Sequence, residues 1–189
     1  MSLKIRTPLT DQTVLELRVG QRILLSGTIY TARDEAHRRL FELIQKGEPL
    51  PFDPRGSVIY YAGPSSTPPG RVIGSIGPTT SSRMDPFTVR LLQLGLKGTI
   101  GKGKRSEEVK RALVEFRAVY FGATGGAGAL LSKCVKRAQV LAFPELGPEA
   151  IMALEVEDFP LVVINDAYGG DLFLEREKWR RGNCQNPPF

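Results

Sequence analysis

The feature that most constrains the fold of this chain is the exchange of strand-like and helix-like patterns through its centre. Short apolar runs at residues 58–62 and 118–122 are bounded by glycine or proline, which is typical of buried strands. Residues 86–95 and 107–116 carry apolar side chains at helical spacing. Because a strand-rich opening third precedes this alternation, we expect an α/β fold with β/β/α layers and a mixed sheet.

The opening third carries a period-two pattern. Leu15, Leu17 and Val19 alternate with polar residues, so residues 13–30 predict two strands joined at Gly20. After these strands, apolar residues at helical spacing predict a helix that ends at Gly47.

The closing part of the chain predicts a helix over residues 148–154 and a last strand over 161–164. We expect one domain over residues 1–178, and we interpret residues 179–189 as a flexible or partner-bound tail.

A short polar stretch between two apolar patterns carries four consecutive hydroxyl side chains and an arginine. An apolar run over residues 72–76 predicts a strand, Gly77 and Pro78 interrupt it, and Asp85 with Pro86 is typical of a helix N-cap and first turn. The predicted connecting loop holds Thr79, Thr80, Ser81, Ser82 and Arg83. These groups, beside a helix N-terminus, suit a small anion such as a carboxylate. The local pattern equally supports a polar turn with a surface arginine.

Two further basic residues lie at predicted strand–helix junctions, where ligands collect in such sheets. Arg33 stands at a predicted helix start, against the helix dipole, which is tolerated where the residue is exposed or holds an anion. Lys102 lies between Gly101 and Gly103. A phosphate-loop interpretation fails here, because that motif needs a glycine where Leu96 stands and Ser or Thr after the lysine.

His37 is the single histidine of the chain and lies one helical turn after Arg33. A lone histidine is more often structural than catalytic, so we assign it a supporting position behind the site. Asp34 and Thr80 receive the same interpretation.

Composition excludes several functions. Cys134 and Cys184 are far apart, without a nearby histidine, so a self-contained zinc or iron–sulfur site is not expected. The net charge of +6 admits acidic partners, but aromatic residues make up 8% and no RNA-binding aromatic signature occurs, which disfavours nucleic acid. No apolar run reaches membrane-spanning length, and the N-terminus lacks a signal-peptide core, so we expect a soluble cytoplasmic protein.

Several motifs follow one another along nearly the whole chain: Leu25-Ser-Gly-Thr-Ile-Tyr-Thr-Ala-Arg-Asp-Glu-Ala-His37 with Arg38-Arg39, Tyr61-Ala-Gly-Pro64, Gly77-Pro-Thr-Thr-Ser-Ser-Arg-Met-Asp85, Ile100-Gly-Lys-Gly103 and the Gly125-Gly126 turn. In this order they resemble the β subunit or C-terminal domain of class I iron–sulfur fumarate hydratases and the related tartrate dehydratases. Glu35 and the Ser81-Ser82 pair depart mildly from the family pattern.

The resemblance implies the family's swivelling β/β/α domain and a role for four residues. Arg33 and Arg83 would hold substrate carboxylates, Thr79 would be the catalytic base, and Lys102 would be a further substrate ligand. A threonine becomes a plausible base only in a desolvated pocket crowded with cations.

The resemblance also implies a partner. A four-iron cluster needs at least three thiolates, and the chain has two distant cysteines. The [4Fe-4S] cluster would be carried by a cysteine-bearing α subunit, with its open iron acting as a Lewis acid on the substrate hydroxyl. No metal is assigned to this chain, and a heterotetramer of two α and two β subunits is expected.

Three functions stay open at this point. Reversible hydration of fumarate to malate is the first, and L-tartrate dehydration by the same residues is the second, since both substrates are four-carbon dicarboxylates. The third is a non-catalytic anion-binding or nucleic-acid-binding module that uses the positive charge.

Overall fold

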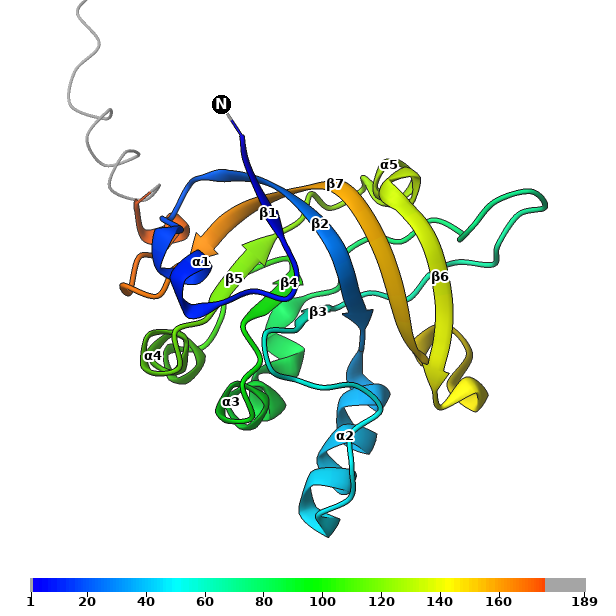
Figure 1. Ribbon diagram of the computed structural model, residues 1–189, viewed down its shortest axis with the longest axis horizontal. Helices are drawn as coiled ribbons and strands as arrows, with labels where there is room; N and C mark the ends of the chain where they lie inside the picture. Colours follow the sequence, from blue (N-terminus) through cyan, green and yellow to red (C-terminus); the bar gives the residue numbers. More distant parts are fainter. Residues whose placement is uncertain (1, 176–189) are drawn as a thin grey trace, which may run out of the picture.

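The computed structural model describes residues 2–175 and shows a mixed, seven-stranded sheet that curls into a partly closed barrel (Figure 1). Its first five strands run parallel to one another. The strands are β1 (Leu3–Arg6), β2 (Arg22–Thr31), β3 (Val58–Tyr60), β4 (Gly98–Gly101), β5 (Val119–Gly122), β6 (Val135–Ala142) and β7 (Ile151–Asn165).

The long strand β7 closes the sheet. One edge of β7 pairs antiparallel with β2 along most of its length, and its other edge pairs first with β6 and then with β5. The sheet order is therefore β1-β2-β3-β4-β5-β7-β6 with an additional β2–β7 pairing. Because β2 and β5 are both joined to β7, the carboxyl ends of β2, β3 and β4 are held at a fixed position relative to one another.

Helices cover one side of the sheet. α2 (Asp34–Lys46), α3 (Asp85–Gln93) and α4 (Glu107–Glu115) lie together beneath it in Figure 1. The shorter elements are α1 (Asp11–Glu16), α5 (Gly128–Leu131) and the 3₁₀ helices η1 (Ser81–Met84), η2 (Ser132–Cys134) and η3 (Pro144–Glu149). In the described residues no helix combines the length and apolar character needed to cross a membrane.

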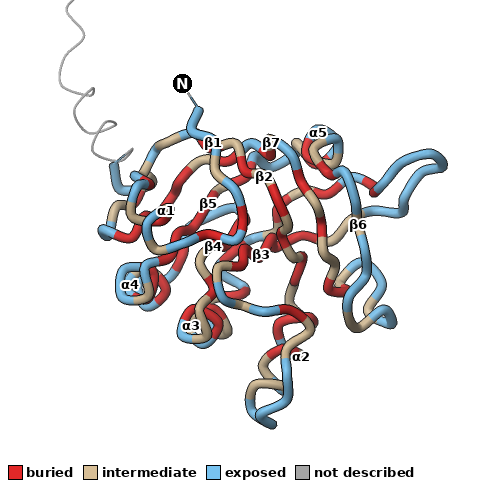
Figure 2. Tube along the Cα trace, in the orientation of Figure 1, coloured by how far each residue is buried: buried red, intermediate tan, exposed pale blue. Residues whose placement is uncertain are grey.

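Two cores lie on the two faces of the sheet. Alternate residues of β3 divide between them: Val58 and Tyr60 face the inside of the curled sheet, and Ile59 faces the helices. Figure 2 shows buried positions concentrated along the strands and on the sheet-facing sides of the helices. The predicted α/β class with a mixed sheet is confirmed.

Capping signals in the sequence predicted two helices well. α2 ends at Gly47, which has φ 69° and donates its backbone N–H to Ile44 O. α4 begins after Ser106, whose hydroxyl accepts a hydrogen bond from Val109 N. The strands predicted at residues 58–62 and 118–122 are also present as β3 and β5.

Three sequence-based predictions were wrong. Asp11–Glu16 is a helix and not a strand, because Thr10 caps it and Val14 and Leu17, three residues apart, are both buried. Residues 72–76 are not a strand among the described elements, although Ile73 and Ile76 are buried as predicted for apolar residues.

The third error concerns residues 148–154. They do not form the predicted helix, since η3 ends at Glu149 and β7 begins at Ile151. The strand is stabilised by pairing with β2 and β6 on both edges, so long-range hydrogen bonds override the local pattern. The predicted tail at 179–189 lies outside the described residues.

Candidate functional site

The four residues assigned as ligands or base lie on elements that end at the same edge of the sheet. Arg33 is the N-cap residue of α2 directly after β2, and Arg83 lies in η1. Thr79 lies just before η1, and Lys102 follows β4. The parallel order of β2, β3 and β4 brings these segments to one edge because their carboxyl ends point the same way.

Backbone hydrogen bonds hold Thr79 beside Lys102. Lys102 N donates to Thr79 O at 3.2 Å, and Ser81 N donates to Lys102 O at 2.9 Å. Thr79 N donates to Tyr61 O at 2.7 Å, which ties the threonine to the end of β3. The predicted base is therefore fixed on both sides, although the sequence placed it in an unstructured loop.

Asp34 joins the two arginines. Arg83 Nε and Nη2 donate to the two carboxylate oxygens of Asp34 at 2.8 and 2.7 Å. Asp34 Oδ2 also lies 4.0 Å from Arg33 Nε. One edge of the Arg83 guanidinium is thus occupied by Asp34, which leaves Nη1 directed elsewhere, while the Arg83 side chain keeps half of its surface exposed.

Arg33 is held from behind by Glu149, a residue that the sequence analysis did not single out. Glu149 Oε1 lies 3.6 Å from Arg33 Nη2, and Glu149 Oε2 accepts a hydrogen bond from Glu35 N at 2.9 Å. Glu149 therefore caps the N-terminus of α2 and neutralises the cation there. Within residues 2–175 the buried Nε of Arg33 has no hydrogen-bond partner.

The two threonines differ in environment. Thr79 is partly buried, whereas Thr80 is exposed and forms an isolated bridge with Lys102. Lys102 is exposed, and its Cδ lies 3.9 Å from where a Cβ on Gly125 would stand, so the glycine turn borders the lysine. We name the set Arg33, Asp34, Thr79, Arg83 and Lys102 the open patch.

His37 lies behind the open patch and is fully buried. Its Nδ1 is 2.8 Å from Arg33 O, so Nδ1 carries the proton and donates, since a carbonyl only accepts. Burial lowers the pKa of His37 to about 4, with smaller opposing and supporting contributions from its neighbours. The imidazole is therefore neutral near pH 7 and fixes the Arg33 backbone.

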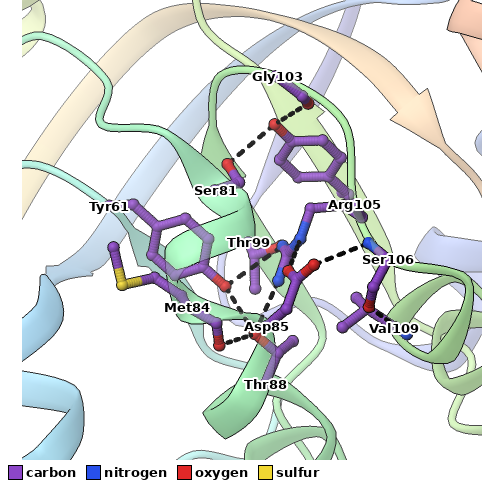
Figure 3. A network of polar contacts seen from close by, with 11 residues as sticks. Tyr61, Ser81, Met84, Asp85, Thr88, Thr99, Gly103, Arg105, Ser106 and Val109 are labelled. Atoms are coloured by element: carbon purple, nitrogen blue, oxygen red, sulfur yellow. Dashed lines mark hydrogen bonds and ion pairs between the residues drawn. The ribbon is translucent and has the colours of Figure 1, made fainter.

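A second arginine–carboxylate pair lies beneath the patch, inside the protein. Arg105 Nε donates to Asp85 Oδ1 at 2.6 Å, and its side chain is fully buried (Figure 3). The other guanidinium nitrogens donate to Thr88 Oγ1 at 2.7 Å and Thr99 Oγ1 at 3.0 Å, and one lies 3.3 Å from Tyr61 OH. We name these residues the buried network: Tyr61, Asp85, Thr88, Thr99 and Arg105.

The buried network corrects one interpretation of the sequence and adds a residue that it did not reveal. Asp85 is not the N-cap of α3, because the cap residue is Met84, and the Asp85 carboxylate instead binds Arg105 and accepts from Ser106 N at 2.7 Å. Arg105, which the sequence analysis did not single out, is 4% exposed. Its Asp partner stands 20 residues away, so no local pattern could have revealed the pair.

Metal ligands do not gather in the part of the chain that the structure describes. No cluster of three or more His, Cys, Asp or Glu side chains there could hold a metal ion. Cys134 is partly buried at the end of η2, and Cys184 lies outside the described residues.

Comparison with known proteins gave one family and a consistent set of relatives. The family model described as Fumarase C-terminus matches residues 1–176. Fumarate hydratase 2 of Leishmania major is 45% identical over 86% of this chain and 29% of its own length. The anaerobic class I fumarate hydratase of Escherichia coli is 43% identical over 88% of this chain and 31% of its own length.

A relative of similar size was also found. The putative L(+)-tartrate dehydratase subunit beta of Methanocaldococcus jannaschii is 42% identical over 90% of both chains. This chain thus spans about three tenths of the fumarate hydratases that it matches, but nearly all of this subunit.

Proposed function

The chain belongs to the Fumarase C-terminus family, and on that premise we propose that it is the β subunit of a hydro-lyase that reversibly hydrates fumarate to malate. The observation that carries this proposal is the open patch, where two guanidinium groups, a lysine and a partly buried threonine meet at one edge of the sheet. Several cations at one edge of the sheet suit a small anion that carries two carboxylates.

The two arginines would bind the substrate carboxylates. The Arg33 side chain is 26% exposed, so a ligand can approach it from the open side of the patch. Arg83 is held by Asp34 through Nε and Nη2, so its Nη1 edge would face the substrate. Lys102 would add a third cation beside Thr79.

Thr79 would take the proton from the carbon next to the hydroxyl-bearing carbon. Removing that proton builds negative charge on the adjacent carboxylate, and pre-positioned guanidinium and ammonium groups lower the barrier most when that charge develops. The same cations favour the alkoxide form of a threonine that is shielded from water. The fixed backbone of Thr79 supports this role because a base must be aligned with the C–H bond.

This chain does not fit the [4Fe-4S] cluster that the family resemblance implies. The cluster needs at least three thiolates, and the described residues contribute Cys134 alone, on η2. We therefore assign the cluster to a cysteine-bearing α subunit that would cover the exposed side of the open patch, in an assembly of two α and two β subunits. We also assign the domain to the layered β/β/α swivelling class and the enzyme to the cytoplasm.

L-tartrate dehydration is the second candidate function. It is favoured by the Methanocaldococcus jannaschii relative, whose printed name is a tartrate dehydratase subunit beta and which this chain matches over 90% of its length. Either reaction would use the same anchors, since both substrates carry two carboxylates on four carbons.

An assay of the reconstituted pair tests the proposal. The chain and its cysteine-bearing partner are combined anaerobically with iron and sulfide, and turnover is measured on malate, fumarate and tartrate. We expect turnover of fumarate and malate by the pair and none by the iron-free chain alone. Turnover of tartrate alone would select the second candidate. A pair that carries the cluster and acts on none of the three would support a non-catalytic anion-binding module.

A further inference from the structure

A tyrosine hydroxyl links the two segments that carry Thr79 and Lys102. Tyr120, on β5, lies 2.9 Å from Ser81 Oγ and donates to Gly103 O at 2.8 Å. Ser81 is two residues after Thr79, and Gly103 is the residue after Lys102. Figure 3 shows Ser81 and Gly103 on opposite sides of this pair of bonds.

The directions of the two hydrogen bonds follow from the single proton of the tyrosine. Because Tyr120 gives its proton to Gly103 O, which can only accept, Ser81 must donate its own proton to the tyrosine oxygen. Burial raises the pKa of Tyr120 to about 12, although Ser81 and Arg105 act in the other direction. Tyr120 therefore stays a neutral donor throughout the physiological pH range.

Gly101 and Arg105 lie next to the hydrogen bonds of Tyr120 and fit closely around them. A Cβ on Gly101 would stand 2.0 Å from Ser81 Oγ, so glycine at this position leaves the space that the serine hydroxyl occupies. The Arg105 guanidinium lies over the Tyr120 ring, 5.0 Å from its centroid, and is itself held by Asp85. The tyrosine is thus fixed through its ring as well as through its hydroxyl.

Two backbone hydrogen bonds join the segments, Lys102 N to Thr79 O at 3.2 Å and Ser81 N to Lys102 O at 2.9 Å. The 3₁₀ helix η1 begins at Ser81, so this pairing does not continue further along the chain. The Tyr120 hydroxyl adds one buried hydrogen bond, to Ser81, and one partly buried hydrogen bond, to Gly103, at the position where the short bridge between the segments ends.

We infer that Tyr120, through Ser81 and Gly103, is a positioning residue that sets the separation and orientation of Thr79 relative to Lys102. This inference rests on the proposed function for its catalytic consequence, but the mechanical link is a property of the chain alone. A displacement of about 1 Å between a base and its substrate can lower the rate by roughly 100-fold. Loss of the link therefore acts on the rate more than on substrate binding.

Amide hydrogen exchange in the isolated chain tests the mechanical part. Tyr120→Phe removes the hydroxyl and keeps the ring and its contact with Arg105. We expect the amides of Ser81 and Lys102 to exchange about tenfold faster, as for the local loss of one buried hydrogen bond. Amides in the β2–β7 pairing should be unchanged.

The matched control is Tyr60→Phe. Tyr60 is equally buried and donates to Ile76 O at 2.9 Å, so the control loses an equivalent hydroxyl–carbonyl bond and leaves the Ser81–Tyr120–Gly103 link intact. Unchanged exchange at Ser81 and Lys102 in Tyr120→Phe, or equal acceleration in Tyr60→Phe, would overturn the inference whatever reaction the protein catalyses.

Kinetics of the reconstituted pair test the catalytic part. Tyr120→Phe should lower kcat about tenfold while KM stays within about twofold, whereas Tyr60→Phe should keep wild-type kcat. Ser81→Ala combined with Tyr120→Phe should cost no more than either change alone, because both break the same link. Faster exchange with unchanged kcat would refute positioning by Tyr120. A wild-type pair without any dehydratase turnover would refute the proposed function and leave the exchange result standing.

Discussion

The open patch and the buried network are built from the same chemical pair, an arginine held by an aspartate, but differ in access to solvent. Arg83 and Asp34 form two hydrogen bonds with side chains that are 50% and 26% exposed. Arg105 and Asp85 are 0% and 11% exposed, and neighbouring hydroxyls accept from the remaining guanidinium nitrogens. A guanidinium with an accessible edge can bind a ligand, whereas one surrounded by internal acceptors holds the fold together.

The difference also explains the arrangement of the site. Arg33 at the start of α2 and Arg83 in η1 keep part of their side chains exposed at the sheet edge. The buried Arg105 joins β4, α3 and the segment before α4. Rigid support under accessible groups is what a site needs to hold its groups in a fixed geometry.

The largest expected effect is on stability. Arg105→Met should lower the free energy of unfolding by about 3–5 kcal/mol, because it leaves the largely buried Asp85 carboxylate without its cation. Arg83→Met, the matched change in the open patch, should cost less than about 1 kcal/mol. Urea unfolding of both variants measures the contrast, and similar losses would remove the distinction between the two regions.

A change of similar size in the free energy of unfolding is expected when the pH is lowered, because of His37 behind the open patch. The folded-state pKa of His37 is lowered to about 4 from its usual 6.5, so between these values the unfolded chain binds more protons and stability falls as the pH falls. As the pH falls from 6.5 to 4, protonation of His37 in the unfolded chain lowers the free energy of unfolding by about 3 kcal/mol. Above pH 6.5, His37 does not make the stability depend on pH.

The measurement compares wild type with His37→Gln, so that the difference between the two curves reports His37 alone. The variant keeps a side-chain N–H donor for Arg33 O and lacks the titrating group. Equal slopes of unfolding free energy against pH in the two proteins would show that His37 is not the cause.

The third effect is catalytic. Thr79→Val removes the hydroxyl and keeps the shape, so kcat of the reconstituted pair should fall at least ~100-fold, the lower end of general-base contributions. Thr80→Val, at the exposed neighbour, should change kcat little. Exchange of the substrate C–H proton with solvent deuterium should disappear only in Thr79→Val. Retained exchange there, with loss in Thr80→Val, would assign the base to the other hydroxyl.

The smallest expected effect follows from replacing the planar guanidinium groups of Arg33 and Arg83. Arg33→Lys and Arg83→Lys keep the charge and lose the bidentate geometry, so kcat/KM should fall roughly tenfold, comparable with one lost hydrogen bond to a charged group. Their unfolding free energies should stay within about 1 kcal/mol of wild type. Near-normal kcat/KM in both variants would contradict the assignment of these residues as carboxylate anchors.

Short-range signals in the sequence determined much of the frame. Ser106 and Gly47 set the ends of two helices, and the apolar run in β3 predicted a buried strand, because caps and periodicity depend on residues three or four positions apart. The residues of the open patch could also be selected from motifs at predicted strand–helix junctions, although the strand predicted before Thr79 is absent among the described elements.

Only the tertiary structure decided which charged groups were buried and which residues held the candidate site. Asp34 reaches Arg83 across 49 positions, and Glu149 reaches the start of α2 across 114. Arg105 is buried and not solvated because Asp85 and Thr88 of α3 and Thr99 of β4 surround it. Burial and long-range pairing are properties of the packed sheet and helices, and they override local propensity because the free energy of a buried charge depends on all its neighbours at once.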